Sequence, residues 1–91
     1  DETLDFVAKM NQLRELDLND SAITDGGLPK LAKLPSLETL RLRATKITDA
    51  GFRDHLFEME TLRQLDLRQT LVEVETVEEW KRRGESRRAF R

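Results

Sequence analysis

Few side chains in this 91-residue chain could take part in catalysis, and none stands in a catalytic arrangement. The only histidine, His55, follows Asp54, but no second histidine or cysteine is available to complete a metal-binding set. The serines at positions 21, 36 and 86 lie outside any Gly-x-Ser-x-Gly motif, and no glycine-rich phosphate loop occurs. The sequence therefore predicts a protein that is not an enzyme and needs no cofactor or metal ion.

A Thr-Asp pair occurs twice in the same context, as Ile-Thr-Asp-x-Gly at residues 23–27 and again at residues 47–51. These side chains could bind a ligand, or their oxygens could cap a helix by accepting hydrogen bonds from free backbone N–H groups. Recurrence at a fixed spacing needs no ligand, so we expect caps. The final glycine of each copy, Gly27 or Gly51, would leave room for close backbone approach.

The Thr-Asp pairs belong to a longer repeat of the form Leu-x-x-Leu-x-Leu-x-x-Ser/Thr-x-Ile/Val. Copies begin at Leu13, Leu37 and Leu62, with spacings of 24 and 25 residues. The alternating leucines have a period of two, which is typical of a strand with one buried face. Strands are therefore predicted at about residues 13–18, 37–42 and 62–67.

Each strand pattern is followed by apolar residues at steps of three or four, which predicts a helix with one buried face. These residues are Leu28, Leu31 and Leu34 in one unit, and Phe52, Leu56 and Met59 in the next. His55 falls at the one-residue insertion that lengthens the second unit, where an exposed helix position is expected. The hydroxyls of Ser21, Thr45 and Thr70 recur after the strands, and we expect them to bond to the backbone of the neighbouring turn.

On these copies the chain resembles leucine-rich repeat proteins. It is most similar to the subclass continuing as Ile-Thr-Asp-x-Gly-Leu, found in cysteine-containing F-box-type repeats and in short bacterial, planctomycete-like repeats. The resemblance covers about 80 of the 91 residues, with Ser or Thr where many such repeats carry Asn or Cys. It implies an α/β, right-handed solenoid, with three parallel strands on the concave face and helices on the convex face.

The two ends of the repeat array differ. Residues 1–12 align with the helical part of a unit whose strand is missing, so we expect an upstream repeat and an exposed edge at the first strand. That edge could pair with a second copy of the chain. At the other end, a capping helix is expected at about residues 76–83, with Gly84 as its C-cap. Trp80 could be a binding anchor, but its position favours the core.

The array is predicted to span residues 1–84 and to be followed by a basic tail at residues 85–91. Residues 81–91 carry a net charge of +5, which leaves −7 for residues 1–80. The tail could be a solvated terminus, a nucleic-acid contact or a docking segment for an acidic surface. Its arginines are not interleaved with aromatic residues, so nucleic acid is disfavoured and a solvated tail is expected.

No segment has the length and hydropathy of a membrane span, so no membrane partner is predicted. The chain contains no cysteine and shows no signal-like segment. These observations leave the compartment undetermined, with the cytoplasm slightly favoured.

Stacking the three copies brings charged strand residues side by side. Two columns alternate in sign, Arg14/Glu38/Arg63 and Asp17/Arg41/Asp66, and we expect pairing within each column. Arg43 and Arg68 instead place two like charges together beside Asn19, a juxtaposition that an acidic partner would relieve. The candidate partner-binding residues are Arg43, Arg68, Arg41, Glu15, Asp17 and Asp66.

Taken together, the sequence predicts a non-catalytic protein–protein interaction module that binds a protein through its concave face. An alternative is a substrate-recognition or accessory domain of an enzyme complex, such as a ubiquitin-ligase receptor, a kinase or a protease, with catalysis elsewhere. A third is a purely structural or designed repeat fragment.

Overall fold

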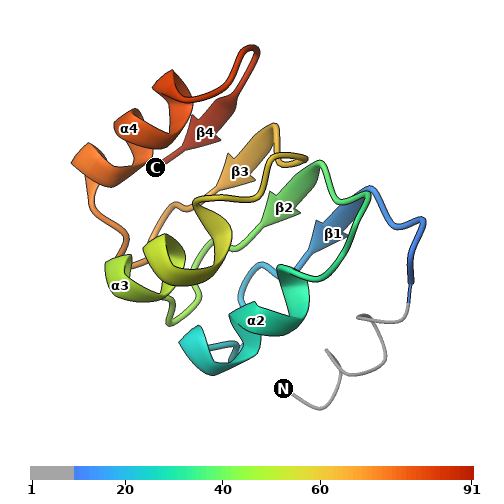
Figure 1. Cartoon of the computed structure of the whole chain (residues 1–91). Helices are drawn as coiled ribbons and strands as arrows, with labels where there is room; N and C mark the ends of the chain where they lie inside the picture. The colour runs from blue at the N-terminus through green and yellow to red at the C-terminus, as the bar shows by residue number, and fades with distance from the viewer. Residues whose placement is uncertain (1–9) are drawn as a thin grey trace.

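A computed structural model describes residues 10–91 as a stack of coils that share one parallel sheet (Figure 1). The strands pair in the order β1-β2-β3-β4, so each strand lies beside the strand of the preceding coil. Leu16, Leu40 and Leu65 are direct neighbours across the first three strands. The α/β solenoid and its leucine register are therefore confirmed. The strands are β1 (Glu15–Asp17), β2 (Thr39–Arg41), β3 (Gln64–Asp66) and β4 (Arg88–Phe90).

The fourth strand corrects the sequence analysis, which placed three strands in the array and a solvated tail at residues 85–91. Arg88 N donates to Arg63 O at 2.8 Å, and Leu67 N donates to Phe90 O at 2.7 Å. These bonds pair backbone groups that would otherwise lie at the outer edge of β3. The core-facing position of β4 is held by Ala89, opposite Leu65, so the leucine pattern does not extend to this strand.

Helical segments line one face of the sheet (Figure 1). The C-terminal helix begins two residues before its expected start and ends one residue before its expected end. The segments are η1 (Asp25–Gly27), α2 (Leu28–Leu31), α3 (Asp49–Gly51), η2 (Phe52–Leu56) and α4 (Val74–Arg82).

The extra residue of the second unit is accommodated by η2, which is a π-helix. Phe57 N donates to Phe52 O at 2.9 Å, a bond that spans five residues rather than four. A π-turn takes up one additional residue without breaking the helix. Phe52, Leu56 and Phe57 all remain buried as a result. His55 lies within η2 at an intermediate exposure, where an exposed helix position was expected.

The core between the sheet and the helices contains most of the predicted leucine positions, buried isoleucine, valine, methionine and phenylalanine side chains, and Trp80, which is fully buried. Its assignment to the core is confirmed. Leu13, Leu16 and Leu18 of the first coil are only partly buried against the core.

The turn after each of the first three strands contains a left-handed residue that is not glycine. Asp20, Ala44 and Gln69 have φ of 60°, 56° and 59°. In the second and third copies the next hydroxyl stabilises this turn, since Thr45 and Thr70 each donate to the carbonyl three residues earlier at 2.7 Å. The expected hydroxyl bonds to the backbone of the neighbouring turn therefore form at Thr45 and Thr70, within the turn that follows each residue's own strand.

The repeated aspartates join successive coils. Asp25 accepts hydrogen bonds from the backbone N–H of Thr48 at 2.9 Å and from the Thr48 hydroxyl. Asp49 accepts from the backbone N–H of Glu73 at 3.0 Å. The helix cap predicted at Thr48 is confirmed, because its Oγ1 accepts from Gly51 N at 3.3 Å. The cap predicted at Thr24 is wrong, because that side chain makes no capping bond.

The end of α4 also differs from the prediction. Arg83 is the C-cap residue, and Gly84 does not adopt a positive φ. A Cβ at position 84 would lie 2.3 Å from Nε of Arg87, so a larger residue there would require the Arg87 side chain to shift. The Arg87 guanidinium stacks 4.7 Å from the Trp80 ring and donates to Trp80 O at 2.9 Å. Arg87 therefore lies over the last large side chain of the core.

The expected helix at residues 2–10, and with it most of the partial first repeat, lies outside the described residues. Within residues 10–91, no helix has the length and apolar character required to cross a membrane.

Candidate functional site

The candidate site is the face of the sheet turned away from the helices, called the open face below; it corresponds to the concave face of the sequence analysis. Side chains alternate along each strand, so residues between the leucines project onto this face. The strand register aligns them in two rows. One row is Glu15, Thr39, Gln64 and Arg88, and the other is Asp17, Arg41, Asp66 and Phe90.

Three arginines of the open face are each held in an ion pair. Arg41 lies 3.3 Å from Glu15, and Arg43 lies 3.1 Å from Asp20. Arg68 binds both carboxylate oxygens of Asp66, at 2.9 and 2.7 Å.

These contacts correct two expectations from the sequence. Arg43 and Arg68 are not an unrelieved pair of like charges, because each already has its own carboxylate. Arg41 pairs with Glu15 rather than within the column of Asp17 and Asp66. The left-handed turn at Asp20 brings a carboxylate to Arg43 that strand alternation alone does not predict.

Asp66 is the most enclosed charge on the open face, with a side-chain exposure of 7%. Hydrogen bonds from Arg68 hold the pKa of Asp66 below its usual value, although burial acts in the opposite direction. The same contact raises the pKa of Arg68. Both groups remain charged at neutral pH, so this bidentate pair fixes the position of the Arg68 guanidinium.

The remaining predicted residue, Asp17, accepts a hydrogen bond from its own turn, from Asn19 N at 2.9 Å. No ion pair to Asp17 occurs among residues 10–91. All six predicted residues, namely Arg43, Arg68, Arg41, Glu15, Asp17 and Asp66, therefore come from adjacent strands and turns of one face.

Two residues of this face, Arg88 and Phe90, were not predicted from the sequence. Phe90 is a large apolar side chain with 48% of its surface exposed, and the Arg68 guanidinium carbon lies 5.6 Å from the centre of its ring. A signal was present in the sequence, because Arg88 follows Gln64 by 24 residues, a spacing that the repeat already uses. The absence of a leucine between Arg88 and Phe90 concealed it.

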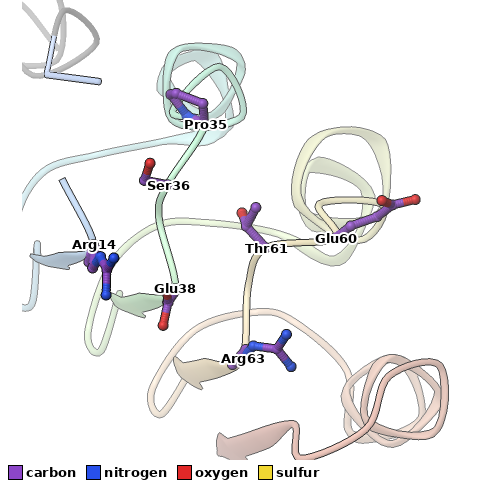
Figure 2. A pocket seen from close by; sticks show the side chains of 7 residues that line it. All are labelled: Arg14, Pro35, Ser36, Glu38, Glu60, Thr61 and Arg63. Carbon is purple, nitrogen blue, oxygen red and sulfur yellow. The ribbon is translucent and has the colours of Figure 1, made fainter. Parts of the chain in front are cut away.

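A polar groove of about 440 Å³ lies beside the sheet, before the starts of β2 and β3 (Figure 2). The groove has charges of both signs and two hydroxyls, a lining that favours no particular ligand. The Arg63 side chain points away from Glu38 (Figure 2) and instead donates to Glu85 O at 3.4 Å. Pairing within the column of Arg14, Glu38 and Arg63 is therefore not observed. The lining residues are Arg14, Pro35, Ser36, Glu38, Glu60, Thr61 and Arg63.

In the part of the chain that the structure describes, no three His, Asp or Glu side chains come close enough to hold a metal ion. His55 lies on the helical side of the molecule, within η2.

In a comparison with known protein families, residues 11–56 match the family model described as Leucine Rich repeats (2 copies). The matched segment begins just before β1 and ends with η2, so it contains the first two strands and the segments that follow each of them. No significant match to a solved structure was found.

Proposed function

The chain belongs to the leucine-rich repeat family, and on that basis we propose that it is a non-catalytic module that binds a protein partner across its open face. Repeats of this family generally mediate interactions between proteins. The open face of the chain is a sheet surface with exposed charged side chains and one exposed aromatic side chain, Phe90, that the core does not use. This feature is the principal support for the proposal.

Ion pairing supports a role in binding for Arg41 and Arg43. Their side chains remain 35% and 39% exposed while each guanidinium is held by a carboxylate. Because these arginine side chains are already held, they lose less rotamer freedom when a partner binds than unrestrained arginines would. The entropic cost of binding is therefore lower. Arg68 is placed in the same way by Asp66, while Glu15 and Asp17 offer carboxylates at the β1 end of the face.

A charge-matched pair of double variants tests the proposal. Arg41→Ala with Arg43→Ala removes two open-face charges whose partners, Glu15 and Asp20, are exposed, so the expected cost in folding stability is below about 1 kcal/mol for each ion pair. Lys33→Ala with Lys46→Ala removes two exposed charges outside the strands.

The immobilised wild-type chain would capture partners from a cell lysate, and affinity for each purified partner would then be measured. We expect the open-face variant to lose about tenfold or more in affinity, a loss of about 1.4 kcal/mol, and the lysine variant to be unaffected. Equal binding by all three chains would refute the open face as the interface. A captured ligase, kinase or protease subunit would indicate the alternative role in an enzyme complex.

A further inference from the structure

Ion pairing divides the arginines near the sheet into two groups. Arg41, Arg43 and Arg68 each have a carboxylate partner. Arg14, just before β1, has no ion pair with any residue in the range 10–91, and neither do four arginines in the segment of β4 or at the start of the neighbouring β3. We call Arg63, Arg87, Arg88 and Arg91 the C-terminal arginine cluster.

Three members of this cluster lie close together, while Arg91 follows the other end of β4, where its Nε donates to Val72 O. The backbone of Arg88 bonds to that of Arg63, and Arg87 immediately precedes Arg88. Burial lowers the pKa of Arg87, the positive charges of Arg63 and Arg83 lower it further, and the carboxylates of Glu58 and Glu60 act more weakly in the opposite direction. Like charges are therefore crowded at this end of the sheet, and a bound anionic group would relieve their repulsion.

Phe90 adds an apolar element beside these charges. The fold does not require an aromatic residue at this position, because Ala89 is the β4 residue that packs against the core. Phe90 lies on the open face, two residues along β4 from Arg88, with the Arg68 guanidinium near its ring. Aromatic residues and arginines together are enriched at the energetic centres of protein interfaces.

We propose that the C-terminal arginine cluster and Phe90 bind an acidic peptide segment of a protein partner. Carboxylates of the segment face Arg63 and Arg88, and one of its apolar side chains packs on Phe90. The inference rests on the proposed function and specifies the chemistry of the partner.

An acidic peptide fits this surface better than a nucleic acid does. Residues 1–80 carry a net charge of −7, which would repel an extended polyanion beyond the cluster. Phe90 is also the only exposed phenylalanine or tryptophan among residues 10–91, whereas single-stranded nucleic acids are usually bound by several stacked aromatics. A short segment with a few carboxylates confines its charge to the basic end.

The test begins with selection from a phage-displayed library of random peptides against the whole chain. Peptides that emerge are synthesised, and their affinities are measured by fluorescence anisotropy. We expect selected peptides to carry net negative charge. Their affinity should fall about tenfold or more for Arg88→Glu and also fall for Phe90→Ala, while Lys33→Glu, a matched charge reversal after α2, should leave it unchanged. Arg88 is exposed and outside the core, so this variant remains informative even if Phe90→Ala weakens β4.

Several outcomes would overturn the inference. Neutral or basic selected peptides would do so, as would acidic peptides that bind Arg88→Glu as well as wild type. If the affinity of those peptides falls only for Arg41→Ala with Arg43→Ala, the proposed open-face function stands and the acidic-peptide site is refuted. If their affinity is unchanged both in that double variant and in the Arg88 and Phe90 variants, both proposals are refuted. Tighter, Arg88-dependent binding of an oligothymidylate probe, or Arg88-dependent self-association in sedimentation, would identify a nucleic acid or a second copy as the occupant instead.

Discussion

Two junctions between successive coils are each made by the repeated aspartate, and the aspartate makes different contacts at each junction. At the first junction, Asp25 binds the backbone and hydroxyl of Thr48. At the second, Asp49 binds the backbone of Glu73 and also pairs with Arg53, at 3.1 Å. The shared part is a carboxylate that accepts a backbone N–H from the next coil, and the remaining contacts are specific to each junction.

The difference explains where the repeat needs glycine. A Cβ at Gly51 would lie 2.1 Å from Oδ1 of Asp25, so the carboxylate of one coil occupies the space above the glycine of the next. Thr76 stands at the equivalent place in the following coil, fully buried, and its hydroxyl accepts a hydrogen bond from Arg53 at 2.9 Å. The Asp and the Gly of the motif therefore depend on each other across coils rather than within one copy.

The largest effect is expected from disrupting the core that both junctions share. Leu40→Ala should cost about 2–5 kcal/mol, because β2 is flanked on both sides and the site cannot collapse easily. Chemical denaturation measures the loss. A loss below about 1 kcal/mol would contradict the position of Leu40 in the core, where it is fully buried.

Gly51→Ala should break the first junction alone, at a cost of about 1–3 kcal/mol from overpacking against Asp25. The matched experiment repeats this substitution in an Asp25→Ala background. There the clash is absent, and alanine should be neutral or should stabilise the helix by up to about 1 kcal/mol. Denaturation of all four chains gives the coupling energy, and the same cost in both backgrounds would refute the interdependence of Asp25 and Gly51.

Thr76→Gly should make the second junction resemble the first and weaken it. The variant loses a hydrogen bond worth about 0.5–1.5 kcal/mol and places glycine inside α4 at a further cost of about 1 kcal/mol. Thr76→Ser keeps the hydroxyl and serves as the control. Thermal unfolding should rank wild type, then Thr76→Ser, then Thr76→Gly; equal stability of the two variants would show that the hydroxyl contributes nothing.

The features that follow a period were predictable from the sequence. Leucines at a spacing of 24 or 25 residues can be buried together only in one register, and Leu16, Leu40 and Leu65 adopt it. The fourth strand was not predicted, because Ala89 fills the place of a leucine and backbone pairing rather than a large apolar side chain holds β4.

The candidate site was predicted less completely for a different reason. Strand alternation placed the six residues correctly on one face, but it does not determine which carboxylate a long arginine side chain reaches. Arg68 folds back to Asp66 in its own coil, and Arg43 reaches a carboxylate in the left-handed turn at Asp20. These choices depend on turn geometry and side-chain direction, which the repeat pattern does not encode.

The smallest expected effect is on the pH dependence of the free energy of unfolding. It distinguishes the contribution of Asp49, at the second junction, from that of exposed surface charges. Burial acts to raise the pKa of Asp49, but hydrogen bonds from Thr76, from the backbone of Glu73 and from Arg53 outweigh it and hold the pKa below its usual value. A carboxylate whose pKa is lower in the folded than in the unfolded chain contributes stability above the unfolded pKa. That contribution is lost as the pH falls through the folded pKa.

Asp49→Asn should therefore lower the free energy of unfolding at neutral pH and reduce its decline between about pH 5 and pH 2. Asp66, whose pKa Arg68 also lowers, keeps its own acid dependence in this variant, so the decline becomes shallower without disappearing. Glu75→Gln is the control, since Glu75 is exposed and has no ion pair among residues 10–91. Urea denaturation across this pH range should show parallel declines for wild type and Glu75→Gln. An equally steep decline for Asp49→Asn would mean that the charge of Asp49 adds nothing to the second junction, and that its contacts with Glu73 and Arg53 matter only as neutral packing.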